Sequence, residues 1–146
     1  MLYRINKYLV IAFILYLFTL IFLTLFTHNY YTYGKSSNLI PFSSVRLMLR
    51  SGSSALFIKN IVGNVILFLP LGIFLPMIIR SKQRFAWQLS LGCMVSAVIE
   101  LCQYFFAARI FDIDDILLNT LGTLIGWLFF MIVQTLRRKV IIFYSH

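Results

Sequence analysis

The sequence predicts an all-α integral membrane protein built as a single bundle of four transmembrane helices. Only 12% of its residues are charged and 61% are hydrophobic, whereas a soluble domain carries about 25% charged residues. Its apolar runs approach the ~20 residues that a helix needs to cross ~30 Å of hydrocarbon. Such segments must be helical, because lipid offers no partner for an unsatisfied backbone group. The length of 146 residues suits one transmembrane domain over residues 1–146.

Four segments have the required length and composition, and we expect helices at about 8–26, 60–79, 85–108 and 116–136. The first has a basic start, as signal peptides do, but its apolar stretch is too long and no small-residue cleavage site follows it. We therefore interpret it as a retained helix.

Three local features refine the expected helices. Pro70 is predicted to kink the second helix and to free a carbonyl or two near mid-membrane. Gly122 and Gly126 form a small-xxx-small pattern on the fourth helix, which favours close packing against a neighbour. The loop segment 43–58 mixes apolar and basic residues and is predicted to lie on the outer surface as an interfacial helix, broken at Gly52.

Lysine and arginine placement predicts the orientation. Eight of the 13 basic residues lie before the first helix, in residues 80–84 and after the fourth helix. Cytoplasmic loops are enriched in Lys and Arg, so we expect a multi-pass membrane protein with both termini in the cytoplasm. The net charge of +9 comes from these short flanking clusters, which argues against a nucleic-acid partner.

The acidic residues are confined to one 16-residue window and are Glu100, Asp112, Asp114 and Asp115. An ionisable group at membrane depth is costly, so it marks a functional site by default. Asp112 or Asp114 would alternatively serve as the N-cap of the fourth helix, where free backbone N–H groups favour a carboxylate. For Glu100 the alternative is a polar cluster that only holds helices together.

The polar residues of three helices are predicted to converge at the outer side of the membrane. Their spacings put each set on one helix face, and the topology brings the three sets to the same depth. Arg109, in the connection before the fourth helix, would pair with the carboxylates. The residues expected to line one outward-facing cavity are Asn64, Glu100, Gln103, Asp112, Asp115 and Asn119.

Four blocks of the chain together resemble the VanZ-like family of small bacterial membrane proteins. The blocks are Asn38–Phe42, Asn64–Gly72, Glu100–Gln103 and Arg109–Gly122, in family order. The resemblance implies a membrane protein whose founding member is associated with low-level resistance to teicoplanin, a glycopeptide antibiotic. It implies polar site positions at Asn64, Glu100, Gln103, Arg109, Asp112, Asp115 and Asn119. Asp114 is outside this pattern and is therefore the better candidate for a simple cap.

Three functions are compatible with these observations. In the first, the outward polar site binds a lipid-linked cell-wall precursor or a lipid-tailed glycopeptide, with membrane lipids as neighbours. In the second, the protein is an enzyme acting on an envelope lipid, with Glu100 as general base or with the carboxylates holding a divalent cation. In the third, it is a structural or accessory bundle. No organic cofactor is expected, and no metal-ligating His/Cys spacing is present.

Overall fold

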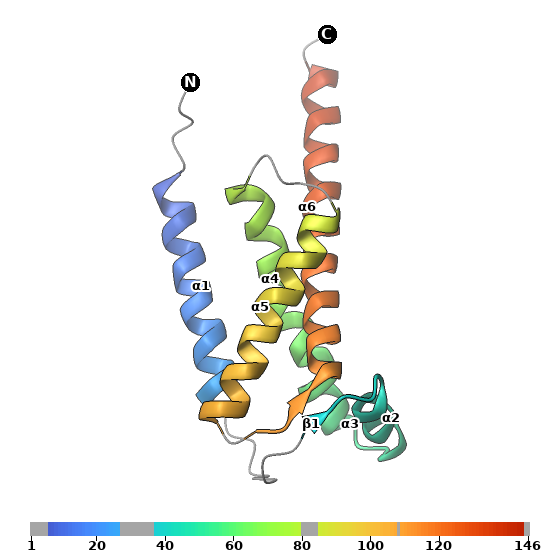
Figure 1. The fold of residues 1–146 in the computed structure, drawn as a ribbon. Helices are drawn as coiled ribbons and strands as arrows, with labels where there is room; N and C mark the ends of the chain where they lie inside the picture. The colour runs from blue at the N-terminus through green and yellow to red at the C-terminus, as the bar shows by residue number, and fades with distance from the viewer. Residues whose placement is uncertain (1–5, 27–36, 80–84, 108, 145–146) are drawn as a thin grey trace.

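A computed structural model describes residues 6–26, 37–79, 85–107 and 109–144 of the chain, and these form a bundle of long helices (Figure 1). Four helical segments are long and apolar enough to cross a membrane, which confirms the predicted all-α membrane bundle. They are α1 (Lys7–Phe26), the continuous segment Ser54–Ile78, α5 (Phe85–Phe106) and α6 (Ile113–Tyr144).

The second spanning segment starts about six residues earlier than predicted. It comprises α3 (Ser54–Leu56), the π-helix η1 (Phe57–Val62) and α4 (Gly63–Ile78). Ser53 caps its start by accepting a hydrogen bond from the Leu56 N–H, in the manner of N-terminal serines. π-Turns occur most often near functional sites, and this one lies at the end of the bundle that carries the polar residues.

The fourth spanning helix, α6, also begins earlier than predicted, at Ile113 rather than residue 116, and it extends to Tyr144. Its start is set by Asp112, whose Oδ1 accepts the Asp114 N–H at 2.9 Å. Arg137, Arg138 and Lys139 lie within the helix and are exposed. By length and hydropathy, the described part of α6 that could span a membrane is Ile113–Lys139.

Small residues let α4 and α6 approach each other closely, as the Gly122/Gly126 pattern predicted. A Cβ atom on Gly122 would lie 2.3 Å from the Val65 carbonyl oxygen, and one on Gly126 would lie 2.0 Å from that of Leu69. Gly72 completes the contact from the α4 side, since a Cβ there would lie 1.9 Å from the backbone carbonyl oxygen of Thr123. No side chain fits at these positions, so the helix pair is defined by its glycines.

Pro70 lies inside α4, and Tyr16 of α1 donates a hydrogen bond to a backbone carbonyl group near it. Proline removes one intrahelical hydrogen bond, which leaves nearby carbonyl oxygens in need of donors. The Tyr16 hydroxyl donates to the Leu67 carbonyl oxygen at 2.8 Å. The Tyr16 hydroxyl thus joins α1 to α4 by a specific hydrogen bond, beside the core residues Leu20, Phe68 and Leu71.

The interface between α5 and α6 is polar along much of its length. Asn119 donates to the Ser96 hydroxyl at 2.9 Å. One turn further along, Gly92 leaves space for Thr123, whose side chain would lie 3.0 Å from a Cβ at that glycine. Hydrogen bonds between such groups stabilise helix pairs in lipid by up to about 1–2 kcal/mol each.

The end of the bundle opposite both chain termini carries the short elements (Figure 1). β1 (Ser37–Asn38) pairs in parallel with β2 (Phe111–Asp112), and α2 (Ser43–Arg50) packs beside them. We call this the polar end. Within the segment 43–58, α2 is helical and the chain turns at Gly52 with φ 66°, as predicted. Residues 54–58 belong instead to the second spanning segment. Leu47 and Leu49 are exposed, and the position of α2 on the outer membrane surface stays a prediction.

The start of α1 and the end of α6 lie at the same end of the bundle, as an even number of spans requires (Figure 1). Four of the eight basic residues used to predict the orientation, at position 4 and within 80–84, lie outside the described residues. The cytoplasmic location of the termini therefore remains a prediction from charge.

Candidate functional site

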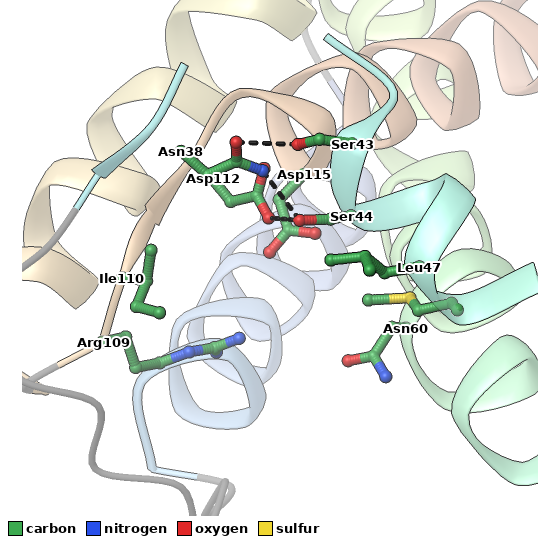
Figure 2. A pocket seen from close by; sticks show the side chains of 10 residues that line it. Asn38, Ser43, Ser44, Leu47, Asn60, Arg109, Ile110, Asp112 and Asp115 are labelled. Atoms are coloured by element: carbon green, nitrogen blue, oxygen red, sulfur yellow. Dashed lines mark hydrogen bonds between the residues drawn. The ribbon is translucent and has the colours of Figure 1, made fainter. Parts of the chain in front are cut away.

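A cavity of about 520 Å³ opens at the polar end, between α2, η1, β2 and the start of α6. Leu47 and Met48 form an apolar part of its wall. Figure 2 shows the polar side chains around the hollow, with Arg109 on one side and the aspartates on another. Its polar lining consists of Asn38, Ser43, Ser44, Asn60, Arg109, Asp112 and Asp115.

Asp112 connects the two chain segments that form the wall. It is the last residue of β2 and pairs with Asn38 in β1. Its Oδ1 accepts a hydrogen bond from Asn38 Nδ2 at 3.1 Å, and its Oδ2 accepts one from the Ser44 hydroxyl. Together with the Asp114 N–H, these donors occupy both carboxylate oxygens. Asp112 therefore positions the wall more than it offers a free charge.

Asp114 is a cap, but for α2 rather than for the fourth spanning helix. Its carboxylate accepts the backbone N–H groups of Phe42, Ser44 and Val45 at the start of α2. Unpaired N–H groups at a helix start favour an anion, and the side chain is only 1% exposed. The capping role of Asp114 is confirmed, but the helix that it caps is α2 and not the predicted one. The sequence could not indicate this, because the capped N–H groups lie about 70 positions away in the chain.

The turn that enters α2 carries strain at Phe42. This residue adopts φ 62° and ψ 13°, and the Ser43 N–H donates to the Ile40 carbonyl oxygen at 3.2 Å. With Pro41 before it, this is the geometry of a type II turn, whose third residue is usually glycine. Left-handed geometry costs a non-glycine residue about 1–2 kcal/mol, and the N–H bond to Asp114 helps to hold it.

Glu100 lies behind the cavity wall and does not line the cavity. It is 2% exposed, and its Oε2 accepts the Asp112 N–H at 3.1 Å. Its carboxyl group is also within hydrogen-bonding reach of Asp115, which Asn64 Nδ2 contacts at 2.7 Å. Two carboxyl groups this close repel each other unless a proton or a cation lies with them. Three predicted residues, Glu100, Asp115 and Asn64, thus form one polar unit, in which Glu100 is buried and the other two are half-buried. Only Asp115 of the three lines the cavity, so the prediction that Asn64 and Glu100 line it was wrong.

Arg109 does not form the predicted ion pair. Its guanidinium is near enough to interact electrostatically with Glu100 and Asp115. Among the described residues, however, it makes no direct contact with a carboxylate, and its Nη1 donates to the Thr24 carbonyl oxygen at 3.4 Å. A guanidinium has five N–H donors, and the described residues accept a hydrogen bond from one of them.

Gln103 and Asn119 contact other partners and do not line the cavity. Gln103 donates to the Thr24 carbonyl oxygen at 2.9 Å, which joins α5 to the end of α1. Asn119 donates to Ser96 deeper in the bundle. The prediction that they share the cavity was wrong, because residues on one helix face can still point to different neighbours. Both side chains are buried and act in helix contacts.

Four lining residues were absent from the predicted site, namely Asn38, Ser43, Ser44 and Asn60. The predicted site was built from polar groups within or next to apolar segments, whereas the first three of these residues belong to the connection between spans. A usable signal was the Asn38–Phe42 block of the family resemblance. Asn60 lies one turn before Asn64, and that spacing already placed both on one face.

The arrangement suits binding by charge and hydrogen bonding. In the described part of the chain, no group of three or more His, Cys, Asp or Glu residues is placed to hold a metal ion. The cavity joins a guanidinium, carboxylates, hydroxyls and amides to an apolar wall. Such a mixture matches a ligand with a polar head and an apolar part.

The comparisons agree with this architecture. The VanZ/LLP1 family model matches residues 13–134. Protein VanZ of Enterococcus faecium is 33% identical over 121 residues, which cover 77% of this chain and 66% of that protein, just under two thirds of its length. No solved structure matches the chain. The match across nearly all of the described bundle shows that this chain belongs to the VanZ-like family.

Proposed function

We propose that this protein acts in the bacterial cytoplasmic membrane by binding a lipid-linked or lipid-tailed ligand of the cell envelope. The ligand would be a cell-wall precursor on a lipid carrier or a glycopeptide that carries an acyl chain. Through this binding, the protein would contribute to resistance against glycopeptides of the teicoplanin type.

The observation that carries the proposal is the cavity at the polar end. Arg109 and Asp115 supply charge for a head group, while Leu47 and Met48 supply an apolar wall for the start of a chain. α2 presents Leu47, which is 68% exposed, where the spanning helices end. An amphiphile arriving from the bilayer would therefore meet an apolar surface first and the charged groups second.

Membership of the VanZ-like family supports the link to resistance. The similar protein of Enterococcus faecium is named Protein VanZ, and the founding member of the family is associated with teicoplanin resistance. The cavity residues Arg109, Asp112 and Asp115 lie within the matched residues 13–134. We extend the resistance phenotype to this chain on that basis.

The test compares charge-removing variants at the two ends of the bundle. Arg109→Gln and Asp115→Asn should reach wild-type levels in the membrane yet lose teicoplanin resistance in a sensitive Gram-positive host. Arg138→Gln, which changes an exposed arginine far from the cavity, should retain it. Membrane abundance by immunoblot and susceptibility to teicoplanin are measured in parallel. Full resistance in both cavity variants would refute the proposal.

A further inference from the structure

We propose that the cavity at the polar end recognises a zwitterionic head group, with the anionic group at Arg109 and a primary ammonium at Asp115. The inference rests on the proposed function and specifies the chemistry of its ligand. It follows from which charges in the site already have partners and which do not.

The anion side is defined by Arg109. The guanidinium lines the cavity and has one long hydrogen bond, to the Thr24 carbonyl oxygen at 3.4 Å. No described carboxylate contacts it directly. Phosphate and carboxylate groups accept two parallel N–H bonds from a guanidinium, so an anionic group in the cavity would use donors to which the described residues offer no acceptor.

The cation side is defined by Asp115. This carboxylate lines the cavity, whereas Glu100 lies behind it. Asp115 accepts one hydrogen bond, from Asn64, and has the Glu100 carboxyl group beside it. Arg109 is near enough to interact with this pair electrostatically, but no described cation contacts it directly. An ammonium group would offset the negative charge of the pair and donate up to three hydrogen bonds.

The other two aspartates do not compete for this role. Asp112 has both oxygens occupied by Asn38, Ser44 and the Asp114 N–H. Asp114 is committed to the start of α2. The charged groups of the cavity that have no direct ionic contact with a described residue are therefore Arg109 and Asp115, which lie on different sides of the same hollow (Figure 2). A ligand of a single sign would satisfy one side and be repelled by the other.

The apolar wall formed by Leu47 and Met48 would contact a lipid chain attached to this head group. A phospholipid with a primary ammonium next to its phosphate has the required chemistry. An amino-acid group on a lipid-tailed glycopeptide has it as well. The shared chemistry is an ammonium and an anionic group within one head group, and soluble phosphoethanolamine separates head-group recognition from the contribution of the tail.

The experiment measures binding of individual lipids to the purified full-length protein by native mass spectrometry. Phosphatidylethanolamine carries both charges, phosphatidylglycerol carries only the phosphate, and phosphatidylcholine has no N–H on its cationic group. We expect wild type to bind phosphatidylethanolamine at least about tenfold more tightly than the other two, since a charge-assisted hydrogen bond contributes about 1.5–3 kcal/mol. Soluble phosphoethanolamine should compete, but weakly, because it lacks the acyl chains.

The variants test each side separately. Asp115→Asn should reduce phosphatidylethanolamine binding to the phosphatidylglycerol level and leave phosphatidylglycerol binding unchanged or stronger. Arg109→Gln should weaken both lipids, and Arg109→Lys should restore part of the loss. Arg138→Gln should change neither. Each variant is compared with wild type in thermal unfolding, so that only folded proteins are scored.

Two results would overturn the inference. One is equal binding of phosphatidylethanolamine and phosphatidylglycerol by wild type. The other is an equal loss of both lipids in Asp115→Asn and Arg109→Gln, which would mean that the two residues simply pair with each other. If selectivity is absent while Asp115→Asn still abolishes resistance, the zwitterion assignment is wrong and the proposed function stands. If Asp115→Asn and Arg109→Gln both keep full resistance, the proposed function itself fails.

Discussion

Glu100 and Asp112 are linked by a hydrogen bond from the backbone N–H of Asp112 to Oε2 of Glu100, at 3.1 Å. The bond joins the interior of α5 to the residue that caps α6 and pairs with β1. A buried carboxylate in one helix thus controls where the next helix begins. It also holds the wall of the cavity at the polar end.

Replacing Glu100 with glutamine should separate binding from folding. The amide oxygen of Glu100→Gln can still accept the Asp112 N–H, and a charge that is costly to bury is removed. We expect membrane abundance and thermal stability at or above wild type, together with loss of teicoplanin resistance. Abundance by immunoblot and drug susceptibility check this, and full resistance at normal abundance would favour a purely structural role for the polar unit.

Glu100→Ala provides the contrasting variant. It leaves the buried Asp112 N–H without an acceptor, which costs about 1–3 kcal/mol. We expect a lower thermal midpoint in detergent than for Glu100→Gln. Equal stability of the two variants would show that the bond to Asp112 contributes little.

Asp114→Ala should loosen α2 while the spanning helices persist. The substitution removes the acceptor for three backbone N–H groups at Phe42, Ser44 and Val45, and loss of a cap costs about 0.5–2 kcal/mol. Hydrogen exchange should therefore accelerate in residues 42–50 and remain slow in α4. Ser53→Ala, which removes the cap of α3, is the control and should leave α2 protected. Unchanged exchange in residues 42–50 would contradict the capping role.

Gly126→Ala should separate α4 from α6. The new Cβ would lie 2.0 Å from the Leu69 carbonyl oxygen, and backbone atoms can relieve this only by moving apart. We expect a destabilisation of about 1–3 kcal/mol or more, as in overpacked cores, measured as a lower midpoint of unfolding in detergent.

The matched control for this change is Gly63→Ala. Leaving out the helix backbone within four residues, the nearest atom to a Cβ at Gly63 would be the Ile58 carbonyl oxygen, at 3.5 Å. This is an ordinary contact. Alanine also favours a helix over glycine by about 1 kcal/mol. The control should therefore be neutral or stabilising, and equal loss at both sites would exclude the close approach as the cause.

Cysteine labelling tests the predicted orientation. In a background without Cys93 and Cys102, Ser51→Cys should react with a membrane-impermeant maleimide in intact cells. Arg138→Cys should react only after the membrane is opened. Both positions are exposed in the protein, so access depends on the side of the membrane. The reverse pattern would place the polar end in the cytoplasm and would argue against an envelope ligand reached from outside.

Composition and spacing alone determined the class and the approximate spans of this protein. Charge-poor stretches of about 20 residues have one stable solution in lipid, so four helices could be predicted without knowing how they pack. The Gly122/Gly126 contact was also predictable, because a small-xxx-small pattern has a single geometric use in a bundle. The confinement of Glu100, Asp112, Asp114 and Asp115 to one window correctly indicated which end of the bundle is polar.

Only the tertiary structure decided which of these polar residues meet. Helical periodicity places Gln103 and Glu100 on one face, but the neighbours of that face differ, and Gln103 contacts α1 while Glu100 contacts the start of α6. The capping of α2 by Asp114 and the unpaired state of Arg109 depend on contacts between residues far apart in the chain. Such contacts are selected by packing and by the need to satisfy buried N–H groups, and no local pattern in the sequence encodes them.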